Sequence, residues 1–321
     1  MEKRLSAPLA ARSSPAAATA ALLAHPIFGR IGRTPLVALQ RVGADSGLRV
    51  LVKLESANPG GSVKDRAAGA IVRDAITAGA LPHRRLLDAT SGNTGIAYAM
   101  LGAALGFGVT LCVPGSASPE RRRILLAYGA ELLETDPLEG TDGAIRRARE
   151  RIAERPDEYF YADQYSNAAN PRAHERTTGP EILEGLAGVP LDLFVSSLGT
   201  SGTFVGTARF LRRASPKTRL VSVEPDSAFH GLEGMKHMAS ALVPAIYDPE
   251  LAHVRHAVAT EAGQEMARRL AREEGLFVGP SSGAAVVAAL EAGRATDART
   301  AVVILPDGGE RYLSERFWSG E

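Results

Sequence analysis

The sequence around Lys64 is typical of a reactive amine. Residues 58–64 (NPGGSVK) form a glycine-rich turn that leads into the first turn of a predicted helix. A helix N-terminus is positive because of its free N–H groups and its macrodipole, and positive surroundings favour the neutral, nucleophilic form of a lysine. Lys64 could therefore form a Schiff base. An ordinary surface lysine near a loop is the alternative interpretation.

A second motif, residues 198–203 (LGTSGT), joins a predicted strand to a predicted helix. Its glycines let the backbone approach an anion closely, while its hydroxyls and the helix N–H groups supply donors. The candidate phosphate-binding residues are Gly199, Thr200, Ser201, Gly202 and Thr203. No Gly-Lys-Ser/Thr follows at the spacing of a Walker loop. The glycines at 199, 202 and 206 also miss the dinucleotide fingerprint, although Glu224 lies about 20 residues on. Glu224 is therefore predicted to be an ordinary strand-end residue.

Two further loops carry clustered hydroxyl groups. Residues 90–95 (TSGNTG) offer hydroxyl and N–H donors that suit a carboxylate, and a well-capped helix start is the alternative. Residues 279–283 (GPSSG) form the other loop, in which capping by Ser281 or Ser282 alone would explain the pattern.

The four motifs lie in a chain whose sequence alternates between predicted strands and predicted helices, and these elements would position them. Val63, Ala67, Ile71 and Ala75 recur every four residues, which predicts an amphipathic helix after Lys64. Strands are predicted over 50–54, 86–89, 109–113, 193–196, 220–224, 276–278 and 301–305, and further helices up to 105 and over 121–128, 203–213 and 284–292. The alternation predicts an α/β fold with parallel sheets covered by helices on both faces. Ligands bind such sheets beyond the carboxyl ends of the strands, where the motifs lie.

The chain has 321 residues, which favours two α/β lobes over a single core. The polar, turn-rich segment 157–170 marks the predicted boundary. We expect a flexible N-terminal arm over residues 1–26 and an N-terminal lobe over 27–165, which carries Lys64 and the carboxylate loop. A C-terminal lobe over 166–321 would carry the phosphate loop and Ser281. The first strands of the N-terminal lobe are free to pack with the C-terminal lobe instead.

Composition excludes several classes of function. Lys and Arg (37) balance Asp and Glu (36) without a basic block, which argues against nucleic acid as a partner. The only cysteine, Cys112, lies in an apolar run and is predicted to be a buried core thiol. The histidines lack metal-ligand spacing, so no metal site is predicted, and His174 is assigned a structural role. No apolar stretch approaches the ~20 residues of a membrane span, and a cytoplasmic location is expected.

A Schiff-base lysine, a phosphate loop unsuited to a nucleotide and a carboxylate loop together suggest pyridoxal 5'-phosphate (PLP) and an amino acid. The chain resembles the cysteine synthase and cystathionine β-synthase family of fold-type II PLP enzymes, whose fold is similar to that of the tryptophan synthase β chain. The resemblance extends from about residue 31 to residue 313. Ordered matches lie at 32–36 (GRTPL), 58–66, 90–95, 177–181 (TTGPE), 199–203 and 283–285 (GAA).

The resemblance implies a role for each matching residue. Lys64 would hold PLP as a Schiff base and return as the base that moves the substrate α-proton. Asn93 would hydrogen-bond the ring oxygen, Ser281 would face the pyridine nitrogen, and residues 199–203 would bind the phosphate. The residues implied to bind the substrate carboxylate are Thr90, Ser91, Thr94 and Gln164.

The implied serine partner of the pyridine nitrogen has a chemical consequence. A hydroxyl cannot keep this nitrogen protonated as a carboxylate would, so the ring is a weaker electron sink. Prompt loss of a β-leaving group, which gives an aminoacrylate intermediate, is then favoured over transamination. Addition of a sulfur nucleophile completes a β-replacement with ping-pong behaviour. The resemblance implies a homodimer that forms L-cysteine from O-acetylserine or O-phosphoserine.

The choice of substrate depends on residues 229–238 (FHGLEGMKHM), which depart from the Gln-Gly-Ile-Gly stretch of many relatives. Residues 243–248 (VPAIYD) resemble the branch that uses O-phosphoserine and takes sulfur from a carrier-protein thiocarboxylate. In that branch a basic residue near the position of Lys236 pairs with the substrate phosphate. A solvated basic loop is the alternative for Lys236.

Other functions stay open at this stage. Cystathionine formation and another β-replacement, such as diaminopropionate formation, use the same chemistry. A regulatory paralogue that keeps the fold without turnover is a third possibility, against which the presence of Lys64 argues.

Overall fold

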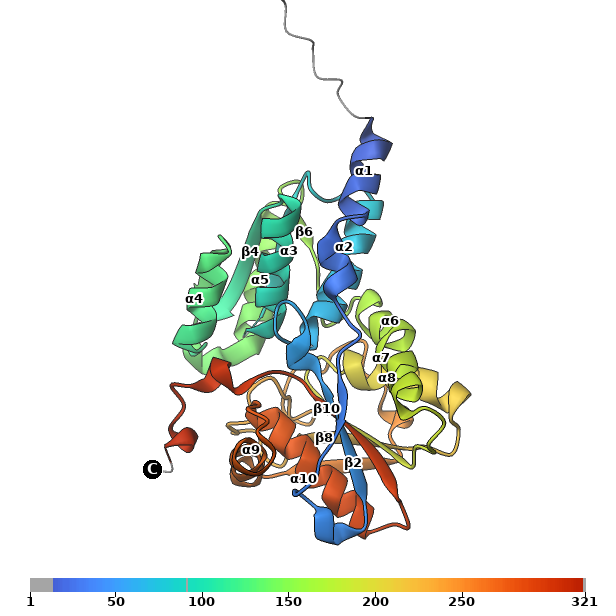
Figure 1. Ribbon diagram of the computed structural model, residues 1–321. Helices are drawn as coiled ribbons and strands as arrows, with labels where there is room; N and C mark the ends of the chain where they lie inside the picture. Colours follow the sequence, from blue (N-terminus) through green and yellow to red (C-terminus); the bar gives the residue numbers. More distant parts are fainter. Residues whose placement is uncertain (1–13, 91, 320–321) are drawn as a thin grey trace, which may run out of the picture.

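The computed structural model describes residues 14–90 and 92–319, which contain two β-sheets enclosed by helices (Figure 1). The six-stranded sheet has the order β1-β2-β10-β7-β8-β9, and the four-stranded sheet has the order β5-β4-β3-β6. Only β1 runs antiparallel to its neighbour in the larger sheet, and every pairing of the smaller sheet is parallel. The predicted α/β class with parallel sheets is confirmed.

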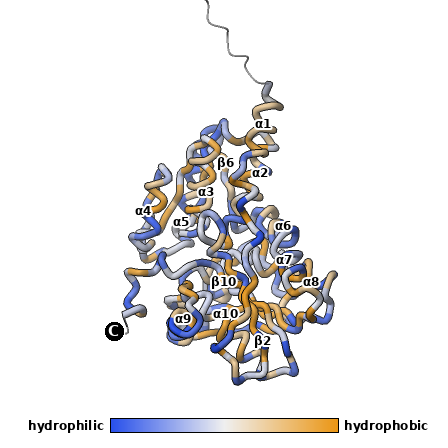
Figure 2. The backbone as a smooth tube through the Cα atoms, viewed as in Figure 1, coloured by the Kyte–Doolittle hydropathy of each residue, from blue (hydrophilic) through white to orange (hydrophobic). Residues whose placement is uncertain are grey.

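The larger sheet is buried on both faces. Its strands are β1 (Leu36–Ala38), β2 (Arg49–Leu54), β7 (Leu193–Ser197), β8 (Arg219–Pro225), β9 (Val254–Val258) and β10 (Thr300–Leu305). Successive side chains alternate between faces, so Val303 packs beneath α9 (Thr260–Glu274) and α10 (Pro280–Arg294), and Val302 packs against α7 (Thr178–Leu186) and α8 (Gly202–Ala214). The strands must therefore be apolar throughout, as the orange colour of β2 and β10 in Figure 2 shows.

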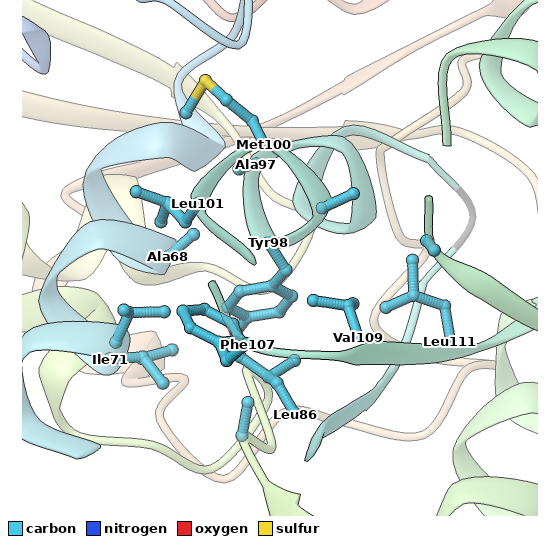
Figure 3. Close-up of a cluster of buried hydrophobic side chains, with 14 of the residues drawn as sticks. Ala68, Ile71, Leu86, Ala97, Tyr98, Met100, Leu101, Phe107, Val109 and Leu111 are labelled. Atoms are coloured by element: carbon cyan, nitrogen blue, oxygen red, sulfur yellow. The ribbon is translucent and has the colours of Figure 1, made fainter. Parts of the chain in front are cut away.

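The smaller sheet contains β3 (Arg85–Ala89), β4 (Val109–Pro114), β5 (Glu131–Thr135) and β6 (Tyr159–Tyr161). One face packs against α2 (Lys64–Thr77), α3 (Asn93–Leu105) and α4 (Pro119–Ala127), and the other against α5 (Gly140–Glu154). Figure 3 shows the aromatic rings of Tyr98 and Phe107 beside Ile71 and Leu86 in the first of these layers. Cys112 is fully buried against α5, which confirms its place in the core.

Most predicted elements are present, and one is wrong. Six of the seven predicted strands coincide with β2, β3, β4, β7, β8 and β10. Residues 276–278 do not form a strand, because the five residues between α9 and α10 pass beside the turn after β10 and only Val278 makes a bridge, to Gly308. The loop over 279–283 therefore follows no strand, in contrast to the other three motifs.

Part of the predicted N-terminal arm, residues 1–26, is helical, and the flexibility of this arm stays a prediction. Residues Pro15–Leu23 form helix α1, which contacts α2, and residues 1–13 lie outside the described part. β1 and β2 belong to the larger sheet although they precede the whole smaller sheet in sequence. The boundary between lobes at residue 165 stays a prediction. Within residues 14–90 and 92–319, no helix has the length and apolarity needed to cross a membrane.

Candidate active site

Loops from both sheets enclose an inner pocket of about 80 Å³. Its lining residues are Lys64, Thr90, Asn93, Thr94, Arg121, Thr141, Gln164, Tyr165, Gly199, Thr200, Gly234, Met235 and Lys236. Several of these residues follow the carboxyl ends of β2, β3, β6 and β7, as the strand-end rule for parallel sheets requires. The structure thus brings together residues from three of the four motifs found in the sequence.

Lys64 is the first residue of α2 and opens onto the inner pocket. Enclosure of its amine by protein lowers the pKa of Lys64, while the carboxylate of Asp307 acts in the opposite direction. The sequence argument attributed a lowered pKa to the positive helix start, whereas burial is the main cause in the structure. The consequence is the expected one, because a lowered pKa increases the fraction of neutral, nucleophilic amine.

The phosphate-loop prediction falls on the segment between β7 and α8. Ser201 has φ 69°, a left-handed conformation that turns the chain into α8. The Ser201 hydroxyl is buried without a hydrogen-bond partner among the described residues, and a buried hydroxyl left unpaired is costly. A Cβ added at Gly199 would overlap the carbonyl of Gly234, and one added at Gly202 would overlap the side chain of Asn170. The two glycines are therefore required by close packing of the protein, and the unpaired Ser201 hydroxyl at the start of α8 is a donor that fits the phosphate of PLP.

Gly202→Ala tests whether this close packing matters. The added methyl group would push against Asn170, and overpacking of this kind typically costs about 1–3 kcal/mol of unfolding free energy. We expect the variant to unfold at lower urea concentration and to bind PLP more weakly, as measured by absorbance titration of the apoenzyme. Gly29→Ala is the control, because nothing lies within 4 Å of a Cβ at that position. Equal behaviour of the two variants would contradict the packing argument.

Asn93 and Ser281 both line a neighbouring pocket, whose wall also contains Lys64 and Asp307. The Asn93 amide donates to Asp307 Oδ2 at 2.6 Å, and its oxygen accepts a hydrogen bond from Arg311. Ser281 lies in the first turn of α10 and is buried. Both side chains are fixed at the wall of the pocket, while the contacts implied for them with the cofactor stay predictions.

The loop after β3 presents hydroxyl groups to the inner pocket. Thr90 Oγ1 accepts hydrogen bonds from the N–H groups of Gly92 (3.0 Å) and Gly95 (3.2 Å), so its own hydrogen is free to be donated. Thr94 donates to Gln164 Oε1 at 2.6 Å, and the Gln164 amide donates to the Ala89 carbonyl at 2.7 Å. Thr94 and Gln164 are thus joined by a hydrogen bond, and together with Thr90 in the same pocket wall they are called the Thr90–Thr94–Gln164 group. Ser91, also predicted here, lies outside the described residues.

Lys236 is buried in the pocket wall, with 8% of its surface exposed. Its amine donates to Asp142 Oδ1 at 2.8 Å and lies 5.3 Å from the centre of the Tyr165 ring. The interpretation of Lys236 as part of a solvated basic loop is therefore wrong, because the loop folds inward. Glu224 assists this folding, since its carboxylate accepts the N–H of Met238 at 3.0 Å.

Arg121 is a second buried cation at the inner pocket, and no sequence signal distinguished it from its neighbours Arg122 and Arg123. Its guanidinium pairs with Glu233 and lies over the Tyr312 ring, 4.6 Å from the ring centre. Glu233 and Asp142, the partners of Arg121 and Lys236, line an adjoining outer chamber of about 540 Å³ and not the inner pocket. Among the described residues, three basic side chains and no acidic one line the inner pocket, and two of the three, Arg121 and Lys236, are paired with these carboxylates.

Asp307 and Arg311 were also not predicted. Asp307 follows β10 and accepts hydrogen bonds from Asn93 and from the Tyr312 hydroxyl, the latter at 2.6 Å. Residues 306–309 (PDGG) form a polar turn after a buried strand, which is the signal that singled out the other loops. Arg311 carries no such signal, because its contacts with Asn93 and Gly60 join residues that are far apart in sequence.

Comparisons with known proteins agree with this site. Residues 27–307 match the family model described as "Pyridoxal-phosphate dependent enzyme". A cysteine synthase of Aquifex aeolicus is 43% identical over 301 residues, which cover 91% of this chain and 92% of that protein. A crystal structure of O-ureido-L-serine synthase superposes with a TM-score of 0.86 at 39% identity, covering 92% of this chain and 95% of the other. An O-acetylserine-dependent cystathionine β-synthase of Helicobacter pylori superposes with a TM-score of 0.84 at 34% identity, covering 90% and 97%.

A buried lysine at a helix start, a loop with free anion donors and these matches define the class: the chain belongs to the family of pyridoxal-phosphate dependent enzymes. Within it, the chain is a member of the cysteine synthase and cystathionine β-synthase group with the type II fold. The predicted cofactor, PLP, is confirmed.

Proposed function

We propose that the chain forms L-cysteine from an activated serine and a sulfur donor by β-replacement. The observation that carries this proposal is the inner pocket, where Lys64 lies among the residues of the anion-binding loop and the Thr90–Thr94–Gln164 group. The anion-binding loop suits a phosphate, and the loop that begins at Thr90 suits an α-carboxylate. A substrate held between them would have its α-carbon near the lysine amine.

In this proposal PLP supplies the electron sink that makes the substrate α-proton acidic. Lys64 Nζ anchors the cofactor and then takes up that proton, for which its lowered pKa is suited. Thr90 and the first N–H groups of α3 hold the substrate carboxylate, since a helix N-terminus favours an anion, and Thr94 joins them when its hydroxyl turns away from Gln164. Ser281 faces the pyridine nitrogen with a hydroxyl and not a charge. The narrow inner pocket limits access of water to the reacting atoms.

The charges of the inner pocket favour a phosphate as the leaving group. Lys236 and Arg121 line both the inner pocket and the outer chamber, and each is paired with a carboxylate that lines the outer chamber. A substrate phosphate is already negatively charged when it binds and would compete with these carboxylates for both cations, whereas an acetyl ester is neutral until acetate leaves. We therefore propose O-phosphoserine as the preferred substrate. O-acetylserine is the second candidate, favoured by the substrate of the H. pylori enzyme.

Lys236→Met is expected to lower kcat/KM for O-phosphoserine about 10- to 100-fold, because one charge-assisted contact is worth roughly 1.5–3 kcal/mol. The same variant should use O-acetylserine nearly as well as the unmodified enzyme. Lys217→Met is the matched control, since Lys217 is exposed on the surface. Unchanged activity of Lys236→Met on O-phosphoserine would refute the role of Lys236.

Stopped-flow absorbance distinguishes the two leaving groups in the unmodified enzyme. Holoenzyme would be mixed separately with O-phosphoserine and O-acetylserine, and the change of the cofactor spectrum followed before any sulfur donor is added. A faster change with O-phosphoserine is expected. This result would also favour a carrier-protein thiocarboxylate as the sulfur donor. A faster change with O-acetylserine would favour sulfide as the donor and leave Lys236 without a role.

The outer chamber supports one further candidate, the formation of cystathionine. Its volume of about 540 Å³ has room for a thiol amino acid, and it contains groups of both charge signs, including Asp142, Glu233 and Arg121. Homocysteine in place of sulfide, with cystathionine measured by mass spectrometry, tests this candidate. A homodimer and a cytoplasmic location complete the proposal as features of the family.

A further inference from the structure

Helix α6 (Ala169–Arg176) lies directly behind the anion-binding loop and packs against α8 (Figure 1). Asn170 and His174 are four residues apart and so lie on one face of this helix. The Asn170 amide donates to Thr200 Oγ1 at 3.1 Å, and His174 Nε2 lies 3.3 Å from Thr203 Oγ1. Two of the loop's threonine hydroxyls are therefore contacted from behind by nitrogen atoms of α6.

His174 is enclosed at both ring nitrogens. Only 1% of its surface is exposed, and its Nδ1 lies 2.8 Å from the hydroxyl of Thr178. Burial, together with the positive charges of Arg66 and Lys64, lowers the pKa of His174 well below its ordinary value, and Glu181 opposes this shift. The imidazole is therefore neutral, with one nitrogen that donates and one that accepts.

The hydroxyl partners determine which nitrogen carries the proton. The Thr178 hydroxyl is fully buried and has no other side-chain hydrogen bond within the described chain, so its hydrogen is donated to Nδ1. Nε2 then carries the proton and donates it to Thr203 Oγ1. The Thr203 hydrogen is left free to be donated into the loop. In the opposite tautomer Thr203 would donate to Nε2 and would present only a lone pair to an anion.

We propose that His174 is a positioning residue for the cofactor phosphate: held as the Nε2–H tautomer by Thr178, it makes the Thr203 hydroxyl a donor to that phosphate. The inference rests on the proposed role of residues 199–203 as the phosphate site. His174 does not touch the phosphate itself. It acts through Thr203, because it determines the direction in which the Thr203 hydroxyl hydrogen points.

The tautomer can be measured in the unmodified holoenzyme. The chain has seven histidines, and ¹⁵N-histidine labelling with His174→Gln as the assignment variant identifies the His174 signals. We expect a pyrrole-type Nε2 and a pyridine-type Nδ1. A protonated Nδ1, whether in the opposite tautomer or in an imidazolium ion, would overturn the inference. The tautomer is measured in the unmodified chain, and the variant serves only to assign the signals.

Variants test the consequence for cofactor binding. His174→Phe removes the donor to Thr203 and is expected to weaken PLP binding roughly 2- to 10-fold, the effect of one hydrogen bond between neutral groups. The ³¹P chemical shift of the bound cofactor should move as well. His174→Gln should restore most of the affinity, because its amide can donate to Thr203 and accept from Thr178. His256→Phe, on strand β9, is the control and should bind PLP normally.

Thr203→Val separates this inference from the function on which it rests. Weaker PLP binding by Thr203→Val, with unchanged affinity and ³¹P shift in His174→Phe, would overturn the role of His174 and leave the phosphate site intact. Unchanged PLP binding by Thr203→Val would overturn the phosphate site itself. Weak binding by both variants, with rescue by His174→Gln, is the result we expect.

Discussion

Lys64→Ala is expected to lower the rate of β-replacement by at least about 10³-fold, the largest effect of any single substitution in this chain. The variant loses both the amine that anchors the cofactor and the base that moves the α-proton, and a positioned base alone contributes about 10²–10⁴-fold. The rate of L-cysteine formation in the presence of added PLP measures the loss. The absorbance band of the lysine-bound cofactor should also be missing.

Two controls make this result specific to the amine. Lys217→Ala removes an exposed lysine and should keep full activity. Urea unfolding of the Lys64→Ala apoenzyme should match that of the unmodified apoenzyme, since Lys64 opens onto a pocket and its side chain takes part in no ion pair of the described residues. If Lys64→Ala kept more than about a tenth of the unmodified enzyme's turnover, Lys64 would not be the catalytic base.

Arg66→Met is expected to lower the free energy of unfolding by about 3–5 kcal/mol, the cost of leaving a buried ion pair with only one partner. Arg66 lies two residues after Lys64 and donates to both oxygens of Glu55 and to both oxygens of Glu181. Glu55 is fully buried, and burial alone would penalise its charge. Urea unfolding monitored by circular dichroism measures the change.

A surface ion pair provides the control for Arg66. Arg122 pairs with Glu134 on the outside of α4, and exposed pairs contribute only about 0–1 kcal/mol. Arg122→Met should therefore unfold nearly as the unmodified protein does. If the two variants unfolded alike, the buried network would not be what holds the first turn of α2, and with it Lys64, in place.

The parts of the site that follow strands could be predicted from the sequence. β2, β3, β7 and β10 are buried on both faces, so they appear as continuous apolar runs whose ends are easy to locate. Polar residues that follow such runs, such as Thr90 after β3 and Thr200 after β7, lie beyond the carboxyl ends of the strands of their own sheet. The family resemblance implied a chemical role for each of these loops. The structure brings residues from most of them to one pocket.

The rest depends on contacts between residues that are distant in sequence. His174 meets Thr203 only because α6 packs on α8, and nothing in its own helix indicates this partner. Arg121 is one of three consecutive arginines, and only its pairing with Glu233, 112 residues later, distinguishes it. The inward fold of the loop that carries Lys236 likewise depends on Asp142 and Glu224. A pattern read along the chain does not contain these pairings.

The most direct test of the proposed function is the formation of L-cysteine by the purified holoenzyme. O-phosphoserine or O-acetylserine would be supplied with sulfide, and L-cysteine quantified over time by mass spectrometry. The account predicts L-cysteine formation that depends on PLP and on Lys64, with the higher kcat/KM for O-phosphoserine. Absence of L-cysteine with both substrates, from enzyme that carries its cofactor, would contradict it.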